Sequence, residues 1–127
     1  MLANKRILIV DDDDDARELL RLMLEGCSAI VLGASNAAEA LRALRTWRPD
    51  VLISDIGMPG RDGYALIRRV RATSHLATLP AVALTSYAGD KDKARALCAG
   101  FDVHLSKPVD AEALVAALVA LFSRPED

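Results

Sequence analysis

Short apolar runs alternate five times with segments whose apolar residues recur at helical spacing, and this alternation restricts the fold more than any other feature of the chain. The apolar runs are brief and rich in β-branched residues, which is typical of strands buried on both faces of a sheet. They cover residues 7–10, 29–32, 51–53, 81–84 and 103–105. Five consecutive strand–helix units predict an α/β fold in which a parallel sheet carries helices on both faces.

Helix signals lie between and after the apolar runs. Asn36 followed by Glu39 is typical of a helix start, and Asp90 and Asp110 are placed to cap two later helices. Gly100 is placed to end the helix that Asp90 opens. Apolar residues at helical spacing indicate helices within residues 16–26, 36–44, 66–70, 90–100 and 110–121.

Size and composition limit the function classes that apply. The chain of 127 residues fits a single domain with no effector domain, and its 52% hydrophobic and 27% charged residues indicate a globular protein. A formal net charge of −2 does not favour nucleic acid or an anionic membrane as a partner. We find no signal peptide and no run of about 20 apolar residues, which predicts a cytoplasmic protein. Cys27 and Cys98 lack metal or redox spacing and are expected to be ordinary thiols.

Polar residues with phosphoryl-transfer chemistry follow four of the five predicted strands. Asp11 and Asp12 follow the first strand, Asp55 the third, Thr85 the fourth and Lys107 the fifth. In open parallel sheets, ligands bind beyond the carboxyl ends of the strands, where the strand order reverses. We therefore expect three carboxylates, a hydroxyl and an ammonium to meet at one edge of the sheet.

Three adjacent carboxylates need a compensating charge. Two carboxylates about 4 Å apart repel by roughly 4 kcal/mol at an effective dielectric constant near 20, and a third adds to this. Carboxylate oxygens suit Mg²⁺, or the similar Mn²⁺, which keeps open positions for phosphate oxygens. Lys107 adds a positive charge and Thr85 a hydrogen-bond donor. This set predicts a phosphoryl-transfer site in which Asp55 itself accepts the phosphoryl group as an acyl phosphate.

The chain resembles the receiver domain of bacterial two-component response regulators over about residues 5–122. Four motifs occur in the family's order, at residues 7–12, 54–63, 83–86 and 105–108. The stretch 100–110 also resembles receivers fused to hybrid histidine kinases. The resemblance implies a flavodoxin-like (βα)₅ fold with strand order 2-1-3-4-5. It also implies that a sensor histidine kinase or a histidine phosphotransfer protein donates the phosphoryl group.

The resemblance implies a role for each residue of the predicted site. Asp55 would be the phosphoacceptor, Asp12 a direct ligand of Mg²⁺, and Asp11 a ligand acting through water. The backbone carbonyl of Gly57 would complete the metal site, and Lys107 would pair with the phosphoryl oxygens. Such a domain is not a conventional enzyme, but it would catalyse its own phosphorylation and dephosphorylation.

The resemblance also implies a conformational switch. Thr85 would move to hydrogen-bond the phosphoryl group, and His104 would occupy the aromatic switch position. The face formed by the fourth helix, fifth strand and fifth helix would then engage a downstream protein. The peptide bond before Pro108 would be cis, and Gly57 and Tyr87 would set the lifetime of the acyl phosphate, which we expect to be long.

Simpler interpretations exist for several of these residues. Asp13, Asp14 and Asp15 suit helix capping, and His104 also fits a half-buried strand position. Two other protein classes also deserve comparison. A phosphatase of the haloacid-dehalogenase type would leave Asp55 without a role, and a flavodoxin-like nucleotide binder would need a glycine-rich phosphate loop that the chain lacks. A degenerate receiver that serves only as a docking module would not need the full set of site residues.

Overall fold

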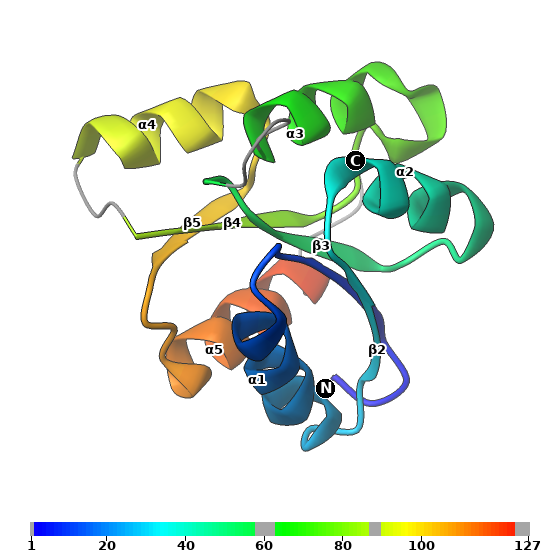
Figure 1. Cartoon of the computed structure of the whole chain (residues 1–127), viewed down its shortest axis with the longest axis vertical. Coiled ribbons are helices and arrows are strands. Elements are labelled where there is room, and N and C mark those ends of the chain that lie inside the picture. The colour runs from blue at the N-terminus through cyan, green and yellow to red at the C-terminus, as the bar shows by residue number, and fades with distance from the viewer. Residues whose placement is uncertain (1, 58–62, 87–89, 124–127) are drawn as a thin grey trace.

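The computed structural model, which describes residues 2–57, 63–86 and 90–123, contains a five-stranded parallel sheet with helices on both faces (Figure 1). The strands are β1 (Arg6–Val10), β2 (Ile30–Ala34), β3 (Val51–Asp55), β4 (Ala81–Thr85) and β5 (Val103–Ser106). The helices are α1 (Asp14–Glu25), α2 (Ala37–Thr46), α3 (Gly63–Ala72), α4 (Asp90–Ala99) and α5 (Ala111–Phe122), with a short 3₁₀ helix at Ser74–Leu76. The predicted α/β class and its five units are therefore confirmed.

The strand order is β2-β1-β3-β4-β5, as the resemblance implies. The order reverses between β1 and β3, which are direct neighbours in the sheet, and in open parallel sheets ligands bind beyond the carboxyl ends of the strands at such a reversal. Residues after β1 and residues at the end of β3 are therefore brought side by side, although they lie more than 40 positions apart in the chain.

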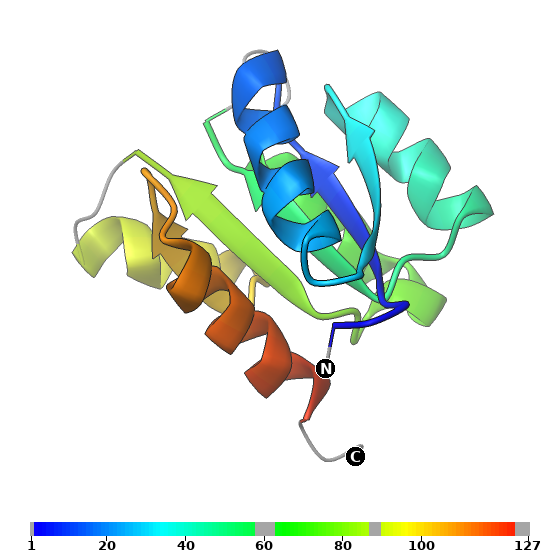
Figure 2. The same cartoon turned by 90° about the horizontal axis from the view of Figure 1, so that it is seen from below.

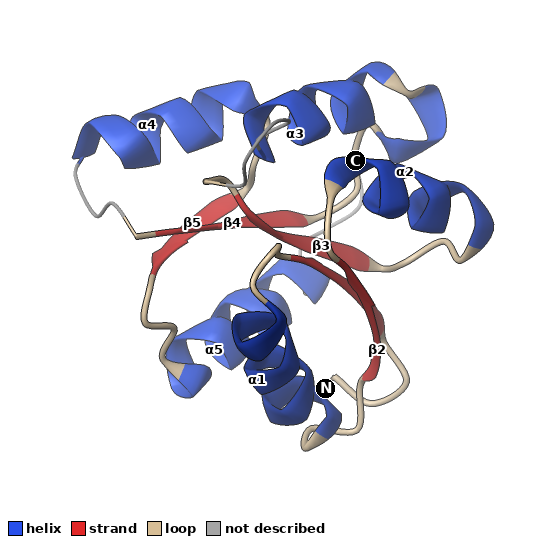
Figure 3. Ribbon diagram, in the orientation of Figure 1, coloured by secondary structure: helices blue, strands red, loops and turns tan. Residues whose placement is uncertain are grey.

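Two apolar layers fill the space between sheet and helices. Helices α2, α3 and α4 cover one face, and α1 and α5 cover the other (Figures 2 and 3). Alternate residues of β4 serve the two layers: Val82 and Leu84 join the layer of α1 and α5, whereas Ala81 and Ala83 join the other. This explains why the central strands are continuously apolar rather than alternating.

The predicted caps of two helices are confirmed, whereas Glu39 and Asp90 differ from the prediction. Asn36 caps α2 by accepting the Glu39 N–H at 2.9 Å, and Asp110 caps α5. Glu39, however, accepts from the backbone N–H and the hydroxyl of Ser35, both at 2.7 Å. Helix α4 begins at Asp90 itself, so Asp90 belongs to the first turn of the helix.

Strand β2 departs from the expected burial. It begins at Ile30 rather than at Ala29, and Ile30 and Leu32 are 45% and 39% exposed. The reason is its position: β2 is an outermost strand, so its side chains are covered less than those of the inner strands.

Among the described helices, none is long and apolar enough to cross a membrane.

Candidate functional site

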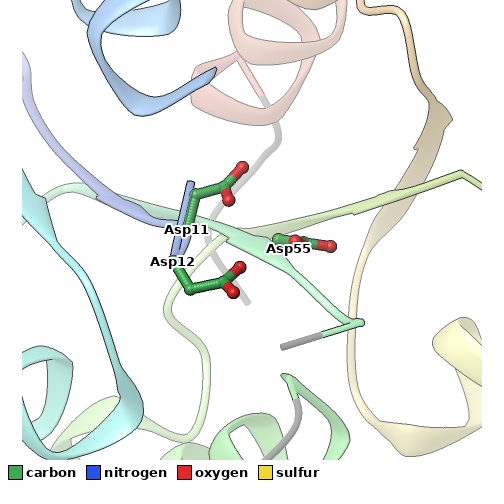
Figure 4. A group of neighbouring side chains, drawn as sticks. All are labelled: Asp11, Asp12 and Asp55. Carbon is green, nitrogen blue, oxygen red and sulfur yellow. The ribbon is translucent and has the colours of Figure 1, made fainter. Parts of the chain in front are cut away.

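Three carboxylates meet where β1 and β3 end. Asp11 and Asp12 directly follow β1, and Asp55 is the last residue of β3. Their side chains each offer an oxygen within 4.8 Å of the others, and Figure 4 shows them grouped around one space. The sequence prediction that these residues converge is therefore confirmed.

Asp11 is fully buried and is held on both of its carboxylate oxygens. Oδ1 accepts the backbone N–H of Asp13 at 2.9 Å, and Oδ2 accepts from the ammonium of Lys107 at 3.1 Å. The Asp11 backbone N–H donates to the carbonyl of Ala34 at the end of β2. These contacts fix the carboxylate in one orientation beside Asp55.

Asp55 remains partly accessible, with 9% of the residue exposed. Its Oδ1 accepts the backbone N–H of Gly57 at 3.0 Å, and its Oδ2 lies 3.3 Å from the Lys107 ammonium. A Cβ added to Gly57 would lie 3.7 Å from Asp55 Oδ1, an ordinary contact distance. The carboxylate is thus oriented by one backbone donor and one charge.

Lys107 links the carboxylates of Asp11 and Asp55. Burial lowers the pKa of the Lys107 ammonium, but the hydrogen bond and negative charge of Asp11, with a further contribution from Asp55, outweigh it and raise the pKa above its usual value. The ammonium is therefore charged at neutral pH. The Lys107 backbone N–H donates to the carbonyl of Thr85 at 2.8 Å, and the bond to Pro108 is cis, as predicted.

Thr85 and His104 share the face of the sheet that α4 helps to cover. Thr85 ends β4 and is 2% exposed. His104 of β5 pairs with Ala83, which lies two residues before Thr85 in β4. Alternate residues of a strand share a face, so both side chains lie on the side of Ala83. The Nε2 atom of His104 is buried and has no hydrogen-bond partner among the described residues.

The donor set fits a hard divalent cation. Among the residues that the structure describes, three carboxylates face one ammonium, which leaves an excess of two negative charges within a few ångströms. Asp12 is exposed and has access to solvent, whereas both oxygens of Asp11 are engaged by protein donors. Oxygen ligands with partial solvent access are the surroundings that Mg²⁺ prefers.

Comparison with known proteins decides the family. Residues 7–119 match the family model described as the response regulator receiver domain. The chain belongs to this family. It is therefore a receiver domain of the two-component response regulators, and the phosphatase alternative is not favoured.

Relatives and solved structures agree with this assignment. The receiver domain is 53% identical over 109 residues to an uncharacterised 14.6 kDa protein in the sodA1 3′ region of Leptolyngbya boryana, covering 86% of this chain and 83% of that protein. A crystal structure from Chloroflexus aurantiacus, assigned as a response regulator, is 37% identical with a TM-score of 0.91, over 95% of this chain and 99% of that one. The signal receiver domain of a histidine kinase from Syntrophus aciditrophicus is 35% identical, with a TM-score of 0.86 and coverage of 97% and 96%.

The receiver domain spans 52% of the length of other relatives, which are transcriptional regulatory proteins. Receiver domains interact with histidine kinases or phosphotransfer proteins, and they bind Mg²⁺ through acidic residues. The cluster of Asp11, Asp12 and Asp55 is an acidic set of this kind.

Two residues near the site have packing roles that the sequence did not predict. A Cβ on Gly63 would lie 2.7 Å from the Ile56 Cα and 2.8 Å from the Asp55 carbonyl oxygen, so α3 can start this close to Asp55 only with glycine there. Arg17 donates to the Asp11 carbonyl at 2.7 Å. The several glycines in the loop after the third strand are a sequence signal for the close approach at Gly63. No local sequence pattern signals the hydrogen bond of Arg17. Tyr87 lies outside the described residues.

Proposed function

We propose that Asp55 accepts a phosphoryl group from a phosphohistidine of a sensor kinase or phosphotransfer protein. An Asp55 carboxylate oxygen attacks phosphorus, a new O–P bond forms, and the P–N bond to the donor imidazole breaks, with its electron pair leaving on that nitrogen. The observation that carries this proposal is the position of Asp55: its partly accessible carboxylate lies 3.3 Å from a lysine that also contacts Asp11. A carboxylate nucleophile with a fixed neighbouring cation suits such a transfer.

The surrounding residues would assist in distinct ways. Asp12, Asp55 and the Gly57 carbonyl would hold Mg²⁺ directly and Asp11 through water, since both Asp11 oxygens already accept protein hydrogen bonds. When bound, the ion would neutralise part of the negative charge on the phosphoryl oxygens. Lys107 would neutralise a further oxygen.

The added charge of about −1.5 to −2 would then bias the conformation of the domain. The Thr85 hydroxyl would donate a hydrogen bond to the phosphoryl group. His104, at the switch position on the same face, would be coupled to this movement of Thr85. A downstream protein would bind the face of α4, β5 and α5. We expect the domain to act in the cytoplasm, where sensor kinases present their phosphohistidine.

The proposal is tested by intact mass after incubation with Mg²⁺ and acetyl phosphate. The wild type should gain one phosphoryl group, and Asp55→Asn should gain none. Asp15→Asn is the matched control, because Asp15 is exposed on α1 and outside the carboxylate cluster. Equal phosphorylation of the wild type and Asp55→Asn would refute the assignment of Asp55.

We further propose a slow loss of the phosphoryl group. Gly57 has no side chain that could orient an attacking water, and Tyr87 is bulky enough to shield the acyl phosphate. The decay of the phosphorylated mass after removal of the donor measures this lifetime, and a lifetime of seconds would contradict the proposal.

A further inference from the structure

Strand β2 forms an apolar edge of the sheet. Its sequence from Ile30 to Ala34 contains no charged or polar side chain, and Ile30 and Leu32 are 45% and 39% exposed. No described strand pairs with its outer side, and β1 occupies its inner side. Edge strands of monomeric proteins are usually protected by charges, proline or bulges, because an open edge pairs with other strands. Within its five residues, β2 has neither charge nor proline.

The backbone of β2 presents its free groups at two positions. The Ile30 N–H donates to the Lys5 carbonyl, and the Ala34 carbonyl accepts the Asp11 N–H, so both residues face β1. Hydrogen-bonding direction alternates along a strand, and so Leu32 also faces β1. Val31 and Gly33, the two residues on either side of Leu32, therefore direct their N–H and C=O groups outward.

We propose that β2 pairs antiparallel with β2 of a second copy of this chain, about a two-fold axis at Leu32. In that register Val31 of one copy lies opposite Gly33 of the other, and each such pair exchanges two N–H···O=C bonds. All four outward groups of each copy are then satisfied. The spacing of the outward groups is symmetric about Leu32, so the edge is complementary to itself, as an isologous interface requires.

The side chains support the same axis. Leu32 and Ile30 lie on the α2 face of the sheet, because Val31 packs in the layer of α1 and α5 and neighbouring residues alternate. The two-fold axis sets Leu32 against Leu32 of the copy, as a pair without hydrogen bonds, in which side chains approach most closely. Ile30 then lies opposite Ala34 of the copy, so the exposed apolar groups of this face cover one another.

Charges beside the edge do not oppose the pairing. On the other face, the Arg17 side chain lies against Gly33, where an added Cβ would be 2.9 Å from the Arg17 Cδ. Arg17 pairs with Asp14, and Arg21 pairs with Glu18 further along α1. The positive charge of Arg17 beside Gly33 is therefore balanced by Asp14.

The interface is small, which sets its expected strength. A strand of five residues is about 16 Å long, and interfaces at the low end of the size range are typical of transient complexes. The dimer is therefore concentration-dependent. It does not depend on the proposed chemistry of Asp55, so a failure of either proposal leaves the other standing.

Sedimentation across a concentration series tests the dimer. The wild type should shift from monomer to dimer, and Leu32→Lys should raise the dissociation constant by about tenfold or more, because two ammonium groups would meet at the axis. Leu97→Lys is the control, since Leu97 is similarly exposed, at 41%, on α4. A wild type that stays monomeric throughout, or equal weakening by both variants, would overturn the proposal.

Disulfide trapping tests the register, in a background with Cys27→Ala and Cys98→Ser. Under a mild oxidant, Leu32→Cys should cross-link to itself, because pairs without hydrogen bonds place Cα atoms about 4.5 Å apart, within disulfide range. Ile30→Cys should not, because the two copies of residue 30 would be about 13 Å apart along the strands. Cross-linking through Ile30→Cys alone, or none through Leu32→Cys, would disprove the two-fold axis at Leu32.

Discussion

Arg71 of α3 holds together the loops at the end of the sheet opposite the acidic site. Its guanidinium donates to the carbonyls of Gly100 at 2.8 Å and Leu79 at 2.6 Å, and it pairs with Asp102 at 3.1 Å. Asp102 in turn accepts the Ala81 N–H, which ties this cluster to the start of β4. One side chain thus fixes the entries to β4 and β5, whose other ends carry Thr85 and Lys107.

Replacing Arg71 with Met should therefore destabilise the fold. The change keeps much of the apolar stem but removes the guanidinium donor from several carbonyls and the ion pair from Asp102, at an expected cost of about 2–4 kcal/mol in the free energy of unfolding. Urea denaturation measures this cost. Arg69→Met is the control, because Arg69 is exposed on the same helix. A loss below about 1 kcal/mol would mean that water replaces these contacts.

The glycines around Asp55 should differ in their tolerance of a methyl group. Gly63→Ala places a Cβ 2.7 Å from the Ile56 Cα, so the backbone beside Asp55 must shift, and both stability and the rate of phosphorylation should fall. Among the described residues, a Cβ on Gly57 meets only Asp55 Oδ1, at 3.7 Å, so Gly57→Ala should keep a near-normal stability. Thermal unfolding and phosphorylation by acetyl phosphate measure both variants. Equal damage from the two substitutions would contradict this account.

At the scale of elements, three helices begin with a predicted capping residue whose short polar side chain forms the cap. Asp13, Asn36 and Asp110 accept N–H groups from the first turns of α1, α2 and α5. Carboxylate caps also interact favourably with the helix dipole. The capping interpretation of Asp13 is confirmed, which separates its role from that of Asp11 and Asp12 in the same acidic run.

Asn36→Ala should cost about 1 kcal/mol of stability, the usual value of a side-chain cap. Asn36→Asp should retain most of it, because a carboxylate oxygen can accept the same Glu39 N–H. Urea denaturation of the two variants provides the comparison. If both lose the same stability, the cap at α2 does not contribute as described.

Glu39 makes the start of α2 sensitive to acid. Hydrogen bonds from the Ser35 backbone and hydroxyl lower the pKa of Glu39. A lowered folded-state pKa contributes stability above the unfolded value, near 4.3, and this contribution is lost as the pH falls through the folded pKa. From about pH 5 to about pH 3, the wild type should therefore lose more stability than Glu39→Gln. We expect this difference in stability to be small because Glu39 is exposed. Curves of stability against pH that run parallel for the wild type and Glu39→Gln would contradict the prediction.

At the scale of the whole molecule, the carboxylate cluster joins stability to ion binding. Asp11 and Asp12 follow β1 and Asp55 ends β3, so the fold must hold these two strand ends together against the repulsion of the carboxylates. In the proposed function Mg²⁺ would bind the folded cluster, whereas the unfolded chain would offer it no such site. At about ten times its dissociation constant, Mg²⁺ should therefore raise the free energy of unfolding by about 1.4 kcal/mol.

Thermal unfolding with and without Mg²⁺ measures this gain, and a chelator should reverse it. Asp12→Asn should reduce the gain, and without Mg²⁺ it should unfold at a higher temperature than the wild type, because one of three clustered negative charges is gone. Asp15→Asn should respond to Mg²⁺ as the wild type does. An identical response of the wild type and Asp12→Asn would remove Asp12 from the site.

The sequence by itself determined the fold class, the five strand–helix units and the side chains at the strand ends. These follow from local patterns: apolar periodicity, capping residues and the rule that parallel strands present their carboxyl ends together. The convergence of Asp11, Asp12 and Asp55 could be predicted for this reason. The predicted positions of the strands agree with the structure, with small shifts such as the start of β2.

Only the tertiary structure decided how these groups contact one another. The Lys107 ammonium and the Asp11 carboxylate are 96 residues apart in the chain, and no local pattern specifies that they pair. The same holds for the Arg71 contacts, the close approach of Gly63 to the Asp55 carbonyl, and the open edge of β2. Periodicity reports which side of an element is apolar, whereas burial and pairing depend on what the rest of the chain places beside that element.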